Sequence, residues 1–130
     1  MVKKTYNIEF LFKALADRTR LRLISLIGGS EVCVCFFVAV LKISQPKISR
    51  HLAYLRRAGI VSARREGKWM HYRLMDPPDE HAARIFREVR AALSEHPEMH
   101  RDRENLMQIC GAATLPVLLR RAPRPLDLAA

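Results

Sequence analysis

Two cysteines separated by a single residue, Cys33 and Cys35, are the side chains of this sequence with the most distinctive chemistry. Thiolates are soft ligands, so a close pair of them would select a soft, thiophilic ion. A third cysteine, Cys110, lies far along the chain, and an odd count with this spacing is not typical of a disulfide scaffold. The spacing alone leaves a second interpretation open, in which Cys33 and Cys35 are small apolar residues of the core.

A block of positive charge is the second feature that indicates a binding function. The chain carries 23 Lys and Arg against 13 Asp and Glu, a net charge of +10 at pH 7. Residues 42 to 73 hold nine of these cations and a single acid, Glu66. Such a block favours a polyanionic partner, because each cation that neutralises a phosphate releases counterions. A solvated basic surface without a partner is the alternative.

The elements that must position these residues follow from the hydrophobic periodicity, which predicts four helices before Gly59. They cover about residues 7 to 16, 18 to 27, 32 to 41 and 45 to 58. Asp17 and Ser44 are suited to cap the second and fourth helices, and Pro46 falls in a first helical turn, where its missing N–H costs little.

After Gly59 the pattern changes to that of two strands, at residues 60 to 65 and 68 to 75, with a turn at Glu66 and Gly67. A long helix is expected from Asp79, and Pro97 separates it from a further helical stretch at residues 98 to 110. Two helices joined by a short turn and followed by a basic hairpin predict a mainly α fold, a winged helix-turn-helix. We expect residues 1–110 to form this domain and residues 111–130 to form an extended or disordered tail.

The fourth helix has two faces. Ile48, Leu52 and Leu55 would point to the core, whereas Lys47, Arg50, Tyr54 and Arg57 form a separate polar stripe. Gln can form paired hydrogen bonds with adenine, and Arg or Lys with guanine, so the start of this helix is suited to read bases. The basic hairpin is suited to contact phosphates or the minor groove. The residues expected to contact DNA are Ser44, Gln45, Lys47, Ser49, Arg50, His51, Tyr54, Arg57, Arg64, Arg65 and Lys68.

Three segments in this order resemble the ArsR/SmtB family of winged-helix repressors. LADRTRLRLISLI at residues 15 to 27 is similar to the second helix of that family, QPKISRHLAYLRRAGIV at 45 to 61 to its recognition helix, and GKWMHYRL at 67 to 74 to its wing. The resemblance covers about residues 8 to 95. It implies a homodimer built on the first and last helices and bound to an inverted repeat in double-stranded operator DNA. It also implies release from DNA when a metal or metalloid binds.

The run EVCVC at residues 31 to 35 resembles the ELCVC stretch of the arsenic-responsive members. This resemblance implies that arsenic(III), as arsenite or methylarsenite, is the inducer and that Cys33 and Cys35 bind it. Those members often continue ELCVCDLC, whereas Phe36 and Val38 here replace the acid and the third cysteine. Either Cys110 of one of the two subunits supplies the third thiolate, or only two thiolates bind. Two thiolates would favour a methylated or aryl arsenic(III), whose own carbon fills the third place.

A mechanism follows if the third helix is continuous from residue 32. Residues two apart on an ideal helix point about 200° away from each other, so Cys33 and Cys35 could not both reach one ion. We therefore expect binding to unwind this helix and to misplace the recognition helix that follows it. Coupling of a few kcal/mol would be enough to release DNA.

Other functions are weighed against this one. A thiol-redox repressor would oxidise Cys33 and Cys35 instead of binding an ion. A zinc or nickel repressor would use the last long helix, but its ligand set of Asp79, His81, Glu95 and His96 is incomplete, because Ala92 occupies one ligand position. A basic RNA-binding protein is the remaining alternative.

No enzyme is expected, since the sequence has no C-x-x-C motif, no glycine-rich phosphate loop and no paired catalytic carboxylates with a base. No signal peptide is visible, and the longest apolar run, residues 32 to 41, is about half a membrane span. Free thiols are typical of a reducing compartment. The sequence therefore predicts a soluble, cytoplasmic protein.

Overall fold

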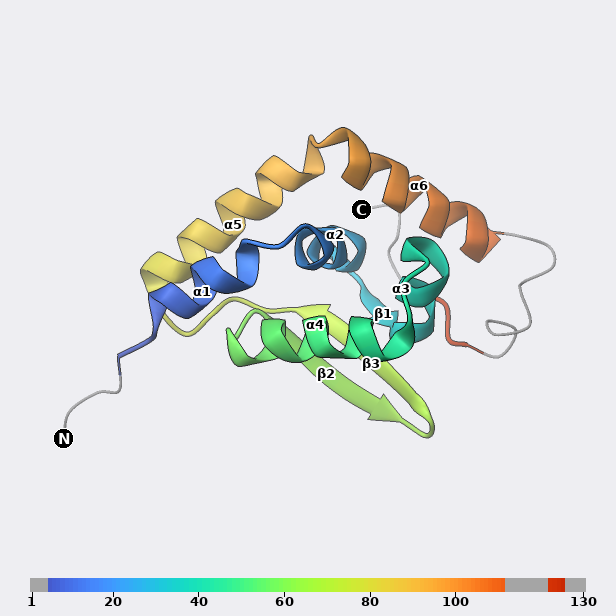
Figure 1. Cartoon of the computed structure of the whole chain (residues 1–130), viewed down its shortest axis with the longest axis horizontal. Coiled ribbons are helices and arrows are strands. Elements are labelled where there is room, and N and C mark those ends of the chain that lie inside the picture. Colours follow the sequence, from blue (N-terminus) through green and yellow to red (C-terminus); the bar gives the residue numbers. More distant parts are fainter. Residues whose placement is uncertain (1–4, 112–121, 126–130) are drawn as a thin grey trace.

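The computed structural model describes residues 5–111 and 122–125, which form six helices around a small sheet (Figure 1). In chain order the elements are α1 (Ile8–Leu15), α2 (Arg18–Ile27), β1 (Glu31–Cys33), α3 (Val34–Leu41), α4 (Gln45–Arg57), β2 (Val61–Glu66), β3 (Trp69–Leu74), α5 (Glu80–Ser94) and α6 (Pro97–Gly111). The predicted winged helix-turn-helix is confirmed, with α3 and α4 as its helical pair and β2 and β3 as its wing. Most of the predicted tail lies outside the described residues.

Of the two predicted capping residues, Asp17 caps its helix with its side chain, whereas Ser44 occupies the N-cap position of α4 without a capping hydrogen bond. The side chain of Asp17 accepts a hydrogen bond from the Arg20 backbone N–H at 3.0 Å, which caps α2. Asp79 caps α5 in the same way through the Ala82 N–H at 2.8 Å. Each bond satisfies one of the backbone donors that a helix start leaves without a partner.

The sheet has three antiparallel strands in the order β1, β3, β2. The predicted helix over residues 32 to 41 is wrong in its first two residues, because Glu31–Cys33 is a strand that pairs with β3. Val32 lies opposite Tyr72 and is fully buried. The pairing with β3 holds this β-branched residue in an extended conformation. The apolar periodicity of the neighbouring residues gives no information about that partner strand.

The core lies between the sheet and helices α1 to α6. Ile48, Leu52 and Leu55 of α4 are completely buried, as the helical periodicity predicts. Phe86 of α5 and the two phenylalanines of α3 are also inaccessible to solvent. This packing fixes α4 against the domain, so its opposite face is presented to solvent at a defined angle. No helix among the described residues combines the length and apolar character that crossing a membrane requires.

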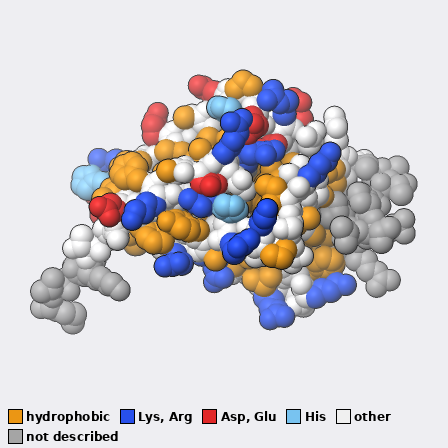
Figure 2. Space-filling view, in the orientation of Figure 1, with side chains coloured by type: hydrophobic (Ala, Val, Ile, Leu, Met, Phe, Trp, Pro, Cys, Tyr) orange, Lys and Arg blue, Asp and Glu red, His pale blue; other side chains and the backbone are white. Residues whose placement is uncertain are grey.

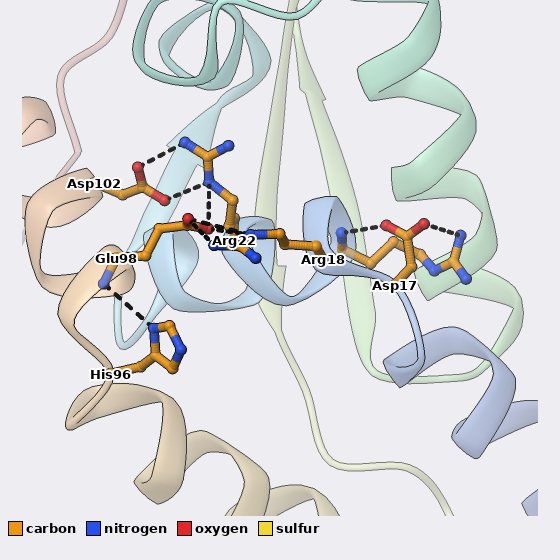
Figure 3. A network of polar contacts seen from close by, with 7 residues as sticks. Asp17, Arg18, Arg22, His96, Glu98 and Asp102 are labelled. Carbon is orange, nitrogen blue, oxygen red and sulfur yellow. Dashed lines mark hydrogen bonds and ion pairs between the residues drawn. The ribbon is translucent and has the colours of Figure 1, made fainter.

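The last helix, α6, is joined to α2 by ion pairs between residues 80 positions apart (Figure 3). The Arg22 guanidinium donates two hydrogen bonds to Asp102, at 2.8 and 2.9 Å, and Arg18 pairs with Glu98. The Asp102 side chain is only 5% exposed. A bidentate pair with one buried partner is the kind of ion pair that contributes measurably to stability.

An Asp102→Asn variant is expected to lower the free energy of unfolding by about 2 kcal/mol, because it removes the bidentate, buried partner of Arg22 and leaves only Glu98, at 3.4 Å, as its counter-charge. Urea unfolding measures this change. Glu104→Gln on the same helix is the matched control, since Glu104 is exposed and forms no ion pair with another described residue. An equal loss of stability in both variants would contradict a specific role for the Arg22–Asp102 pair.

Candidate thiol site and nucleic-acid interface

The two neighbouring cysteines lie where β1 ends and α3 begins. Cys33 is the N-cap residue of α3 and has an extended backbone, with φ −70° and ψ 141°, while Cys35 lies in the first turn of the helix. This change of backbone direction brings the sulfurs together, and the Cys35 thiol donates a hydrogen bond to Cys33 Sγ at 3.1 Å. The expectation that the two thiols point to opposite sides of one helix is therefore wrong.

The distance between the sulfurs fits two ligands on one ion. With metal–thiolate bonds of about 2.3 Å, two sulfurs on one ion lie roughly 3.8 Å apart at the tetrahedral angle and, in a narrower pyramid with angles of about 90°, roughly 3.3 Å apart. The observed 3.1 Å is within a few tenths of an ångström of the latter value. Both thiols can thus reach a common ion without unwinding α3.

The surroundings of the pair stabilise one thiolate. The hydrogen bond from Cys35 lowers the pKa of Cys33 to about 7, against the opposing effect of burial, and the backbone N–H groups of Cys35, Val34 and Met70 add to the lowering. The same hydrogen bond and burial raise the pKa of Cys35. Near neutral pH a large fraction of the molecules therefore hold one thiolate and one thiol, which is a suitable state for attack on a thiophilic ion.

This difference predicts a titration near neutral pH. The thiolate absorbance of the wild type is expected to rise as the pH increases through about 7, which is the pKa of Cys33. Ultraviolet absorbance against pH measures it. A Cys35→Ala variant removes the donor and is expected to move the midpoint up, towards the ordinary value of about 8.5. A midpoint that does not move would show that Cys35 is not the cause.

The third cysteine is not brought to this pair within the described residues. Cys110 is buried near the end of α6, where burial raises its pKa. The described part of the chain contains no group of three His, Cys, Asp or Glu side chains that could hold a metal ion. The alternative zinc or nickel ligands, Asp79, His81, Glu95 and His96, do not form such a group either. Asp79 caps α5, and His96 accepts a hydrogen bond from the Glu98 N–H at 3.3 Å.

The N-terminal part of α4 forms an exposed polar surface. Its members among the predicted DNA contacts are Ser44, Gln45, Lys47, Ser49 and Arg50. Ser44 is the N-cap residue, but its hydroxyl forms no capping hydrogen bond, so the first turn keeps donors free for a phosphate. Figure 2 shows Lys and Arg side chains along the lower edge of the molecule, where Figure 1 places α4 and the wing.

Two predicted DNA contacts of α4 lie against the rest of the domain instead. Tyr54 is half-buried and stacks on Phe10 of α1 with 5.1 Å between ring centroids, and the Arg20 guanidinium lies 4.2 Å from its ring. His51 Nδ1 is 3.3 Å from the same arginine. The exposed Arg57 also lies over the Phe10 ring, at 5.3 Å. These contacts attach α4 to α1 and α2, and a DNA contact of these residues stays a prediction.

The wing carries its cations in different settings. Arg65 and Lys68 are exposed near the turn, and Lys68 lies 4.9 Å from the centre of the Trp69 ring. Arg64 instead donates to Glu31 of β1 and to Glu66, each at 3.0 Å. The sequence placed Glu31 in the EVCVC run but could not show its contact with Arg64, which lies 33 positions further along the chain.

His71 is a second residue near the thiol pair that the sequence did not single out. It lies opposite Cys33 in the pairing of β1 with β3, so both side chains project from the same face of the sheet. The ring is 3% exposed, and its Nε2 has no hydrogen-bond partner among the described residues. The Glu66 carboxylate is 4.0 Å from this nitrogen. The cysteine pair is thus directly connected to the strand that forms the wing.

An exposed basic helix and a basic hairpin, held by a helical core, define a winged helix-turn-helix DNA-binding protein. Residues 17–63 match the family described as bacterial regulatory protein, arsR family. An 80-residue stretch, 61% of this chain, is 51% identical to the arsenical resistance operon repressor of Escherichia coli K12 and covers 68% of that protein. The chain belongs to the arsR family of bacterial regulatory proteins.

Two further similarities extend this result. The arsenic resistance transcriptional regulator ArsR1 of Pseudomonas putida KT2440 is 57% identical over 65 residues, which are 49% of this chain and 51% of that protein. The solved homodimeric winged helix-turn-helix DNA-binding domain Mb0332 of Mycobacterium bovis is 32% identical, with a TM-score of 0.55 over 72% of this chain and 83% of that one. The matched stretches thus span 68% of the E. coli relative and about half of the P. putida relative.

Proposed function

We propose that this protein is a homodimeric repressor that leaves an inverted-repeat operator when a trivalent arsenical binds Cys33 and Cys35. The observation that carries the proposal is the pair of sulfurs 3.1 Å apart at the start of the helix-turn-helix, and the lowered pKa of Cys33 supports it. The names of the E. coli and P. putida relatives support arsenic as the inducing element.

The number of thiolates indicates which arsenical fits best. Methylarsenite carries two hydroxyls, and two thiols displace them as two waters, which leaves arsenic bonded to two sulfurs and its methyl carbon. Arsenite carries three hydroxyls, so two thiols leave one in place. Since the described residues offer two thiols at one point, we infer that methylarsenite is the stronger inducer.

The path from the thiols to the DNA-binding surface runs through the sheet. Cys33 pairs with His71 of β3, and Glu31, two residues before it, holds Arg64 of the wing. A shift of β1 on arsenical binding would move β3 and the Glu31–Arg64 pair together. Cys35 belongs to α3, whose tight turn at Lys42, with φ 56°, leads into α4. Both elements that would contact the operator, α4 and the wing, are therefore connected to the cysteine pair.

Fluorescence anisotropy on DNA from upstream of the gene tests the proposal. Under reducing conditions, arsenite and then methylarsenite are titrated into complexes of the wild type and of a Cys33→Ser/Cys35→Ser variant. We expect release of the wild type, at lower concentrations of methylarsenite, and no release of the variant at the same concentrations. Release of both proteins, or of neither, would refute the proposal.

The short distance between the sulfurs also favours a second candidate, a redox-responsive repressor. Hydrogen peroxide would oxidise the two thiols to a disulfide and would itself be reduced to two waters. On this alternative, peroxide without arsenic releases the wild type from DNA, and a dithiol reductant restores binding. If peroxide leaves the complex intact, the arsenical proposal alone remains.

A further inference from the structure

An arginine-lined cleft lies between the turn that precedes β1, the end of β3 and helix α5. It consists of two adjoining cavities of about 450 and 310 Å³, which share Gly28, Gly29, Leu74 and Arg90 as lining residues. These volumes fall at the lower end of the range typical of small-molecule sites. None of the residues predicted to contact DNA or arsenic lines either cavity, so the cleft requires a separate explanation.

The charges around the cleft are unevenly balanced. Arg73, Arg87, Arg90 and Arg103 line it, and Glu31 is the single acid among its described lining residues. Glu31 pairs with Arg64, Arg87 lies 3.4 Å from Asp76, and Arg103 donates to the Ser25 carbonyl at 3.0 Å.

Arg73 and Arg90 differ from the other two arginines. Neither forms an ion pair or a side-chain hydrogen bond with another residue in the described ranges. Two guanidinium groups at one cleft therefore keep their donors available for an anion.

Other groups at the cleft suit a ligand with an anionic end and an apolar body. Ser30 is 6% exposed, and its hydroxyl has no hydrogen-bond partner among the described residues, which is uncommon for a buried polar group. Leu74 and Leu93 add apolar surface. At Gly29 an added Cβ would meet no atom within 4 Å, so the wall of the cleft is open at that point.

We propose that this cleft binds a small organic phosphate, whose phosphate group is held by Arg73 and Arg90. Guanidinium groups form bidentate, charge-assisted hydrogen bonds with phosphate oxygens. The combined space exceeds what a free phosphate ion fills, and the apolar lining suits the carbon part of such a ligand. The cleft is a separate site from the thiol pair, because neither Cys33 nor Cys35 lines it.

Isothermal titration calorimetry of the full chain at low salt tests the proposal with three probes: adenosine monophosphate, ribose 5-phosphate and inorganic phosphate. We expect at least one organic phosphate to bind more tightly than inorganic phosphate. An Arg73→Gln/Arg90→Gln variant should bind it at least about tenfold more weakly, since hydrogen bonds to charged groups are lost. Arg84→Gln/Arg101→Gln removes two exposed charges elsewhere and should bind it normally.

A Gly29→Leu variant tests the contribution of the space in the cleft separately from that of its charges. Its side chain would enter open space at the cleft without changing the net charge, and it should weaken the organic phosphate more than inorganic phosphate. Three results would overturn the proposal: no probe binds, both double variants lose the same affinity, or Gly29→Leu leaves the organic phosphate unaffected. Loss of operator affinity in Arg73→Gln/Arg90→Gln, with phosphate binding unchanged, would assign these arginines to DNA instead.

Discussion

A Cys35→Ser variant is expected to bind methylarsenite about 100-fold or more weakly than the wild type, because it loses the advantage of two linked ligands. Once Cys33 holds the arsenic, the second sulfur is already only 3.1 Å from the first, so the second bond forms within one molecule. The variant should still bind operator DNA like the wild type, since Cys35 lies outside the exposed face of α4. Calorimetry with methylarsenite, and anisotropy with DNA, measure the two quantities.

Cys110→Ser is the matched control, since it also replaces one buried or half-buried thiol by a hydroxyl. If two thiolates are sufficient, this variant binds methylarsenite normally and differs little from the wild type with arsenite. A large loss of arsenite affinity in Cys110→Ser would show that this cysteine, from one of the two subunits, is a third ligand. Wild-type affinity in Cys35→Ser would contradict chelation by the pair.

The sequence predicted the recognition helix and the wing well because their signals are local. The spacing of Ile48, Leu52 and Leu55 marks the buried face of α4, and the strands β2 and β3 differ from the predicted ranges by one residue at each end. Each of these patterns is complete within a few turns of helix or one hairpin. No distant partner is needed to interpret them.

The strand β1 could not be predicted in this way, because it has three residues and its partner β3 is about 40 positions further along the chain. Residues 32 to 41 form one continuous apolar run, and such a run is compatible with a buried helix as well as with a buried strand. That single error placed Cys33 on a helix and turned its side chain away from Cys35. The role of the two cysteines stays a prediction, and the geometry between them depends on the strand.

The polar contacts of the DNA-binding surface show the same limit. Arg64 and Tyr54 belong to basic or polar stripes in the sequence, and the sequence alone indicates exposure for both. Their partners, Glu31 and Phe10, come from other elements, at distances of 33 and 44 positions. Such pairs form only when the fold brings the elements together. A side chain that is engaged in such a pair would have to give up this contact in order to bind DNA.

A Lys47→Ala/Arg50→Ala variant is expected to lose about 100-fold in affinity for operator DNA, because it removes two exposed cations from the start of the recognition helix. Neither residue forms an ion pair with another described side chain, so their charges remain available for the polyanion. If both contact phosphates in each subunit of the proposed homodimer, four cations are lost and the slope of log affinity against log salt should fall by about 3.6. If one of them reads a base, the slope falls less and discrimination against mutated operators is lost instead.

Anisotropy titrations at several salt concentrations, on operator and unrelated DNA, measure both quantities. Arg84→Ala/Arg101→Ala removes the same number of exposed charges from α5 and α6 and serves as the control. Because net charge alone attracts DNA over a Debye length of about 10 Å at moderate salt, the control should lose only a small part of the affinity. Equal losses in the two double variants would mean that the basic composition of the chain, and not the geometry of α4, is what holds DNA.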